Sequence, residues 1–328
     1  MNKIKLTANE IGFMWTQYVQ NTMSIQILSY FLEKVEDEDI KKVIVHALEM
    51  SKYCVRTIKE IFSHEKLPVP EGFSENDVDL NAPKLFSDSL MLMFLENMSK
   101  AGLLAHGLSL AGSARKDIRE LFTYSLTENM KFFNLSTDTS LAKGLFVRAP
   151  QIDIQDEVEY VQGKKYLSPF NKRVLNTIEI SHIFENIKTN TVGTQICMGF
   201  AQTTDSKEVK AYMKRGQKIS QKHIDIFSNM LKESNITAPT GSDIAVSNSN
   251  TRVFSDRLVI FLMSVLSATG QGNYSTASTG SMRYDLTLNY QRLSVEIALF
   301  AKEGLDIMIN HGWLEEPPQA VDHEANTN

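Results

Sequence analysis

The residues best able to do chemistry in this chain are one Glu-x-x-His motif and two further side chains in helical stretches. The motif is Glu179-Ile180-Ser181-His182, and His223 and Glu296 follow later in the chain. Glu and His three positions apart project from one helix face, and such pairs help to ligate two metal ions inside some four-helix bundles. Carboxylate and imidazole groups suit Fe, Mn or Zn. We therefore take Glu179, His182, His223 and Glu296 as candidate ligands of one metal ion.

Each candidate also has a structural interpretation. Glu179 lies in the first turn of an expected helix, where it can form a capping box with Asn176. His223 lies in mid-helix, and a lone helical His more often satisfies buried polar neighbours than binds a metal. A dinuclear site needs a Glu-x-x-His pair on the second helix as well, and Ser220 stands where that Glu is required. Metal binding is therefore the alternative to a protein without a cofactor.

Other catalytic motifs are missing from the sequence. It contains no G-x-S-x-G elbow and no phosphate-binding G-x-x-x-x-G-K-[ST] loop. The pairs Arg115/Asp117 and Arg283/Asp285 fit a structural role near helix starts, where Asp favours the helix dipole and Arg reaches a carboxylate or carbonyl. We expect no catalytic or cofactor-binding residue, and hence no enzyme.

The elements that position these residues are written twice in the chain. The two halves align at a shift of 169 positions, which becomes 168 after one gap. The matched phrases are "LPVP" (67–70) with "ITAP" (236–239), "FSD" (86–88) with "FSD" (254–256), "GSARKDI" (112–118) with "GSMRYDL" (280–286), and "GLFVRAP" (144–150) with "GWLEEPP" (312–318). A period this long makes each copy a complete domain rather than a unit of a solenoid.

Helical periodicity and helix-start signals run through each copy. Apolar residues of the first stretch recur at i, i+3, i+4 and i+7 from Ile11, and Thr7 with Glu10 forms a capping box. Pro68 and Pro70 stop the second helix, and Ser87 of the repeated phrase can cap the third. The pattern predicts an all-α protein of two tandem ferritin-like four-helix bundles, with a long crossover between the second and third helices. Glycines 270, 272 and 280 predict that the third helix of copy two ends early or bends.

Size and composition set the remaining bounds. We expect a first bundle over 1–150, a connecting segment over 151–173, a second bundle over 174–318 and a polar tail over 319–328 of the 328 residues. The net charge of -5 argues against nucleic acid, because phosphate binding needs clustered cations. The apolar stretch 258–270 is too short for a membrane span of about 20 residues. Two separated cysteines and no secretion signal favour a reducing, cytoplasmic setting.

Many of these phrases together resemble a known family. "EIGFMW", "LPVPEGFSENDV", "RKDIRELF", "VLNTIEISHIFENIKTNTVGTQICMGFAQ", "YMKRGQKISQKHIDIF" and "GWLEEPPQA" are similar to the domain-of-unknown-function family numbered 3231, over nearly the whole chain. The resemblance implies an endospore-forming bacterium, ferritin-like helical bundles and a relation in type to spore coat protein F. It places the protein in the cytoplasm of the mother cell or spore. Cys54 stands where the family more usually has His.

These observations predict a non-catalytic helical structural or packing protein that is associated with sporulation and binds to itself. Two similar surfaces on one chain favour repeating contacts between copies. The alternatives are a ferritin-like metal-binding protein with its site in the second bundle, and a bundle that holds a small apolar ligand.

Overall fold

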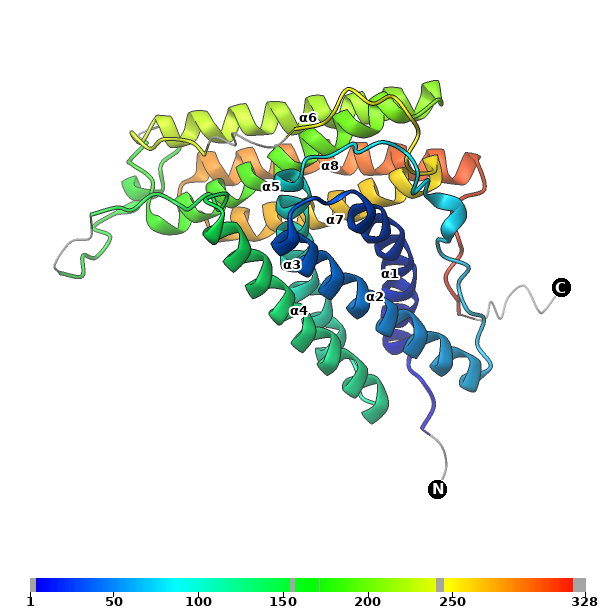
Figure 1. The fold of residues 1–328 in the computed structure, drawn as a ribbon. Helices are drawn as coiled ribbons and strands as arrows, with labels where there is room; N and C mark the ends of the chain where they lie inside the picture. Colours follow the sequence, from blue (N-terminus) through cyan, green and yellow to red (C-terminus); the bar gives the residue numbers. More distant parts are fainter. Residues whose placement is uncertain (1–3, 154–156, 171, 240–244, 321–328) are drawn as a thin grey trace.

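The computed structural model describes residues 4–153, 157–170, 172–239 and 245–320, and within these ranges it contains eight α-helices and no β-strand (Figure 1). Short 3-10 helices, η1 (Glu75–Asp77) and η2 (Lys164–Leu167), lie in the connections. The α-helices are α1 (Ala8–Lys34), α2 (Glu38–Glu65), α3 (Asp88–Ala111), α4 (Lys116–Ala142), α5 (Thr177–Thr203), α6 (Lys207–Lys232), α7 (Asp256–Gly280) and α8 (Tyr284–Asn310). The predicted all-α fold of two tandem four-helix bundles is confirmed.

The predicted helix starts are present. Thr7 and Glu10 exchange hydrogen bonds in a capping box before α1, and the equivalent residues of the second copy do the same before α5. Ser87 and Ser255 accept backbone N–H groups in the first turns of α3 and α7. These polar residues satisfy amide groups that have no partner within the helix.

The expected early end of the third helix in copy two is wrong, because α7 continues as one α-helix to Gly280, and a bend stays a prediction. Tyr274 and Ala277 on its inner face are 1% and 0% exposed, so burial of this face offsets the low helix propensity of the glycines. A Cβ at Gly270 would lie 3.7 Å from Ile297 of α8, within ordinary contact distance. Within the described residues, no helix has the length and apolar character needed to cross a membrane.

Helices that follow each other in the chain pack as pairs, α1 with α2, α3 with α4, α5 with α6 and α7 with α8. A long crossover joins the two pairs of each copy, over residues 66–87 in the first and 233–255 in the second. Figure 1 shows the helices of the second bundle lying across one end of the first. The α5 and α7 helices run close together over more of their length than their equivalents α1 and α3.

The two crossovers pair with each other. Antiparallel bridges join Val78 to Phe254 and Phe86 to Val246, and in each bridge one partner comes from each copy. Further backbone hydrogen bonds, from Asp79 N–H to Val253 O and from Ser247 N–H to Leu85 O, both measure 2.8 Å. Each contact recurs with the two copies exchanged. The bundles are therefore related by a pseudo-two-fold axis, as in an isologous dimer joined into one chain.

Buried aromatic rings fill the junction between the bundles. The ring centroid of Phe86 lies 6.2 Å from that of Phe31 in its own copy and 6.0 Å from that of Phe200 in the other copy. The ring of Phe254 lies 6.0 Å from Phe200 and 5.3 Å from Tyr30. One hydrophobic cluster therefore contains residues of both bundles, and a smaller cluster lies within the second.

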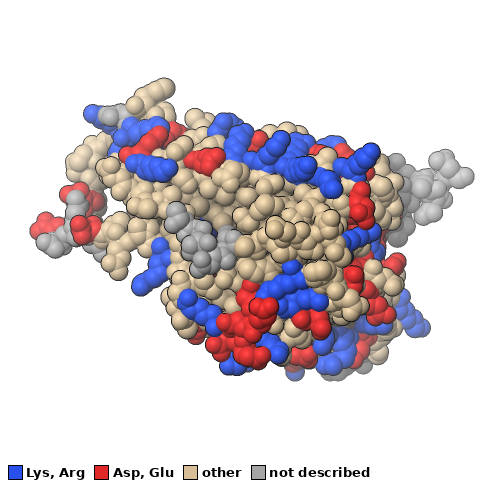
Figure 2. Space-filling model, turned by 45° about the horizontal axis from the view of Figure 1, so that its top comes forward, with Lys and Arg blue, Asp and Glu red and all other residues tan. Residues whose placement is uncertain are grey.

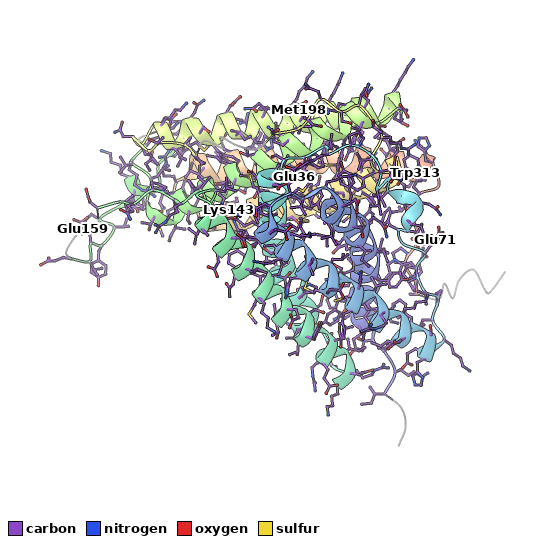
Figure 3. All side chains as sticks on the ribbon, viewed as in Figure 1. Glu36, Glu71, Lys143, Glu159, Met198 and Trp313 are labelled. Carbon is purple, nitrogen blue, oxygen red and sulfur yellow. The ribbon has the colours of Figure 1, made fainter. Side chains whose placement is uncertain are left out.

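The C-terminal segment reinforces the junction. The carboxylate of Glu315 accepts the backbone N–H groups of Glu71 and Gly72 at 2.8 and 2.7 Å, and Figure 3 shows Trp313 on the same side of the molecule as Glu71. The predicted domain limits at 150, 173 and 318 fall between helices. They stay predictions, since the shared core crosses from one bundle to the other. The predicted polar tail lies outside the described residues from 321 onward.

Replacing Phe254 by alanine tests the shared core. We expect Phe254→Ala to lower the free energy of unfolding by about 3–5 kcal/mol, because truncating a buried ring loses apolar burial and leaves a cavity. Phe170, which is 96% exposed, offers the matched control, and Phe170→Ala should change stability by less than about 0.5 kcal/mol. Urea unfolding followed by circular dichroism measures both, and equal effects would contradict a buried junction.

Candidate functional site

A buried hydrogen-bonded chain crosses the core of the second bundle, centred on His223 of α6. The His223 side chain is fully buried, and its Nε2 lies 3.0 Å from a carboxylate oxygen of Glu296 on α8. Its Nδ1 lies 2.9 Å from the hydroxyl of Tyr274 on α7, and Asn190 of α5 donates to that hydroxyl at 2.8 Å. Each helix of the bundle thus contributes one polar side chain.

Burial and the neighbouring Lys222 determine which side chains of this hydrogen-bonded chain are charged. Burial lowers the pKa of His223, and the hydrogen bond with Glu296 opposes this only in part. Burial would raise the pKa of Glu296, but hydrogen bonds from Lys222 and His223 lower it overall. A neutral imidazole then donates from Nε2 to the carboxylate and accepts at Nδ1 from the hydroxyl of Tyr274. Every member has a partner, which is the arrangement of a stabilising core network.

Glu179 has a different structural task. It is fully buried, and its Oε1 accepts the backbone N–H groups of Met282 and Arg283 at 3.1 Å. Its Oε2 forms an ion pair with Arg173 at 2.8 Å. Burial would raise the pKa of Glu179, but the bonds from Arg173 and the backbone lower it overall. Glu10 accepts the two equivalent backbone N–H groups in the first bundle. Both carboxylates fasten the turn before a copy's last helix, a contact that the capping-box pattern did not reveal.

The four predicted metal ligands therefore do not form one set. His223 and Glu296 are in contact, whereas Glu179 is held by Arg173, and His182 lies beside Gly280, where an added Cβ would be 3.0 Å from its Nε2. In the described ranges, no group of three or more His, Cys, Asp or Glu side chains is placed to hold a metal ion. The carboxylate and Glu-x-x-His pattern of a ferritin-like dimetal centre does not fit this arrangement. A metal site stays a prediction that rests on the contact between His223 and Glu296.

The first bundle does not repeat the hydrogen-bonded chain. Cys54 stands at the position of His223, and its Sγ lies 3.3 Å from the hydroxyl of Ser125. His106 stands at the position of Tyr274 and is 5% exposed, and its Nδ1 has no hydrogen-bond partner in the described part of the chain. Burial lowers the pKa of His106 to about 4. Equivalent core positions of the two bundles therefore carry different polar side chains with different hydrogen bonds.

The Arg–Asp pairs have the predicted structural role. Arg115 pairs with Asp117 and Arg283 with Asp285, both at 2.7 Å, around the first turns of α4 and α8. Arg283 also donates to the backbone carbonyl of Arg173 at 2.7 Å, which ties the entry of the second bundle to its last helix.

Comparison with known proteins places the chain in a family. The model of a family described as "Protein of unknown function (DUF3231)" matches residues 1–158 and 167–325. The chain belongs to this family. The resemblance seen in the repeated phrases is thereby confirmed for both copies.

Part of the chain is similar to a solved structure. A crystal structure titled "putative spore coat protein", from Bacillus halodurans C-125, is 19% identical to the chain. That match covers 46% of this chain and 98% of the other, with a TM-score of 0.43. No match was found among curated proteins.

Removing one hydroxyl tests the hydrogen-bonded chain of this family member. Tyr274→Phe takes a partner from both His223 and Asn190, and a buried polar group left unpaired costs about 1–3 kcal/mol of stability. The matched control is Tyr160→Phe, because Tyr160 is 80% exposed and lies outside both bundles. We expect the control to stay within about 0.5 kcal/mol of the wild type in urea unfolding.

The same preparations test the metal prediction. Elemental analysis of protein purified without chelators would establish a metal site if it found one ion per chain that is lost in His223→Ala. That result would contradict a purely structural network. Equal metal contents in the wild type and His223→Ala would instead rule out a metal site at His223.

The buried His106 predicts sensitivity to acid. Its pKa is about 4 in the folded protein, against about 6.5 for an exposed His. Between these values the unfolded chain binds a proton that the folded chain does not, so stability falls as the pH falls through this window. From pH 7 to 5 we expect His106 to account for a loss of about 2 kcal/mol. Urea midpoints of the wild type and His106→Phe at both pH values measure it, and parallel pH dependences would contradict the expectation.

Proposed function

We propose that this protein is a non-catalytic structural protein that self-associates through α8. Support comes from six large apolar side chains on that helix, which are between 40% and 61% exposed. They are Tyr284, Leu288, Val295, Leu299, Leu305 and Ile309. Their spacing sets them along one side of the helix, here called the α8 stripe. The exposed apolar residues extend over the length of α8 and are interrupted by Gln291, Lys302 and Asp306. Large exposed apolar patches rimmed by polar residues mark sites of protein association.

The first copy shows that the fold itself does not require this stripe. The equivalent helix α4 carries five polar residues and one apolar residue at the matching positions. They are Lys116, Glu120, Thr127, Lys131, Thr137 and Leu141. Both helices close a bundle of the same design, so the fold does not require apolar residues at these positions of α8. This contrast is the observation that carries the proposal.

A second copy of the chain is the partner that fits the stripe. The 27 residues of α8 span about 40 Å, and half of a standard interface, roughly 800 Å², is a patch about 30 Å across. Two stripes packed antiparallel about a two-fold axis would each meet an identical surface. Two charged residues within the stripe, Lys302 and Asp306, pair with each other at 2.6 Å, so they add no net charge to it. The bundles also pair about a pseudo-two-fold axis within the chain.

The cellular setting in this proposal rests on the family resemblance, which implies endospore-forming bacteria. We place the protein in the cytoplasm of the mother cell or the spore, as a packing component of a sporulating cell. We propose no nucleic-acid partner for this protein. Figure 2 shows Lys and Arg side chains gathered along the edge where α6 lies, but Arg215 and Lys222 of that helix pair with Glu303 and Glu296 of α8.

Copying the polar residues of α4 onto α8 tests the proposal. The variant Leu288→Glu/Leu299→Lys gives α8 the residues that α4 has at Glu120 and Lys131. We expect the wild type to sediment as a dimer at micromolar concentration and this variant as a monomer, because charged groups in the interface lose their hydration. Analytical ultracentrifugation over a concentration series measures the masses.

The matched control changes the equivalent face of the first bundle. Glu120→Gln/Lys131→Gln alters two exposed positions of α4 and should leave the dimer intact. A wild type that stays monomeric at high concentration, or a variant that dimerises as the wild type does, would overturn self-association through α8.

A further inference from the structure

The first bundle contains a cavity of about 180 Å³ between α1, α2, α3 and α4, which is partly open to solvent and is bordered by α7 of the second bundle. Most of its wall is apolar, and Ile27, Leu95 and Phe132 are among the lining residues. The equivalent space in the second bundle measures about 70 Å³. The two bundles share one design, so residue differences at equivalent positions explain the larger space.

Three core positions differ in size between the two bundles, and two of them, His106 and Asn129, line the first cavity. The second bundle fills its core with His223, Tyr274 and Ile297, and the first bundle has smaller side chains at those positions. They are Cys54, His106 and Asn129. Where the second bundle has a complete hydrogen-bonded chain, the first bundle therefore has a larger cavity.

Polar groups in the cavity wall are placed to bind a ligand. His106 is 5% exposed and its Nδ1 has no hydrogen-bond partner, although almost every buried polar group in a folded protein has one. Asn129 donates to the backbone carbonyl of Ser99 at 2.7 Å, and its side-chain oxygen lies over Gly102, where a Cβ would be only 2.3 Å away. The amide side chain thus fits only because residue 102 is glycine.

The chemistry of the wall limits the class of ligand. Among the lining residues that the structure describes there is no Asp, Glu, Lys or Arg, and burial keeps His106 neutral at pH 7. A charged ligand would enter without a counter-ion, at a high desolvation cost. The volume resembles that of an engineered cavity of roughly 150 Å³ that accepts benzene. A ligand of this size has one ring, or a chain of six to eight carbons.

We propose that the first bundle is a binding site for a small uncharged amphiphile, whose apolar body fills the cavity and whose single hydroxyl or carbonyl group hydrogen-bonds to His106. The second bundle is the filled form of the same site. This inference is independent of self-association, because the cavity lies inside the first bundle and the α8 stripe lies on the outside of the second.

A fluorine NMR titration of the full chain with 4-fluorobenzyl alcohol tests the site. We expect one saturable site per chain for this neutral probe. The matched charged probes, 4-fluorobenzoate and 4-fluorobenzylamine, should bind at least about tenfold more weakly, since the wall offers them no counter-ion. His106→Leu is close to the imidazole in volume but removes the polar partner, so it should weaken binding of the alcohol about tenfold.

Two variants place the larger side chains of the second bundle at the equivalent positions of the first cavity. Cys54→His/His106→Tyr rebuilds its hydrogen-bonded chain, and Asn129→Ile is a separate route to filling the cavity. Both should abolish saturable binding while circular dichroism reports an unchanged helix content. His64→Tyr, at an exposed position of α2, is the control and should bind as the wild type does.

Three results would overturn the proposal. They are the lack of a saturable site for the alcohol, equal affinity for the charged probes, and unchanged binding in whichever filled variant folds. The variant Leu288→Glu/Leu299→Lys should bind the alcohol normally. A failure of self-association is therefore distinguishable from a failure of this site.

Discussion

The pairing of the two crossovers is the contact on which the rest of the molecule depends. A crossover of about twenty residues between helices carries backbone groups that need partners, and here each crossover supplies partners to the other. Phe86 and Phe254 enter the shared core from this pairing. The repeated phrase "FSD" therefore has three tasks at once: the Phe fills the junction, the Ser caps the next helix, and Asp88 accepts the backbone N–H groups of Glu36 and Asp37. In the second copy Asp256 instead accepts the hydroxyl of Thr204 at 2.6 Å, so the Asp of the phrase holds the preceding helix connection in both copies.

Joining two related bundles about a pseudo-two-fold axis also allows them to differ. The junction holds both copies in place, so positions away from it can change in one copy without loss of the fold. Two places show this divergence. On the surface, α8 is apolar where α4 is polar, and in the interior the chain from Asn190 to Glu296 is replaced by a cavity beside His106. Under our proposals, one copy supplies the contact between molecules and the other supplies the ligand site.

The features that sequence predicted are those set by local chemistry or by repetition. Capping boxes, serine caps and the two copies depend on residues a few positions apart or on an alignment, and the structure has them. The features that sequence missed depend on distant parts of the chain. The α7 helix continues through its glycines because Tyr274 is buried by neighbouring helices, and Glu179 is occupied by a turn about a hundred residues later. The sequence could have predicted the α8 stripe, since aligning the two copies position by position pairs apolar residues of α8 with mostly polar residues of α4.

The energetics of the two cores favour a functional origin for the difference between them. The first cavity exceeds the second by about 110 Å³, and at roughly 24 cal/mol for each Å³ this volume costs at most about 3 kcal/mol, because both cavities are partly open to solvent. The unpaired Nδ1 of His106 adds a cost of about 1–3 kcal/mol. The second bundle shows that this fold can avoid both costs with a Tyr and a His at equivalent positions. A neutral ligand that filled the space and paired with the imidazole would recover much of this free energy, so the wall of the first bundle is complementary to a molecule other than the protein itself.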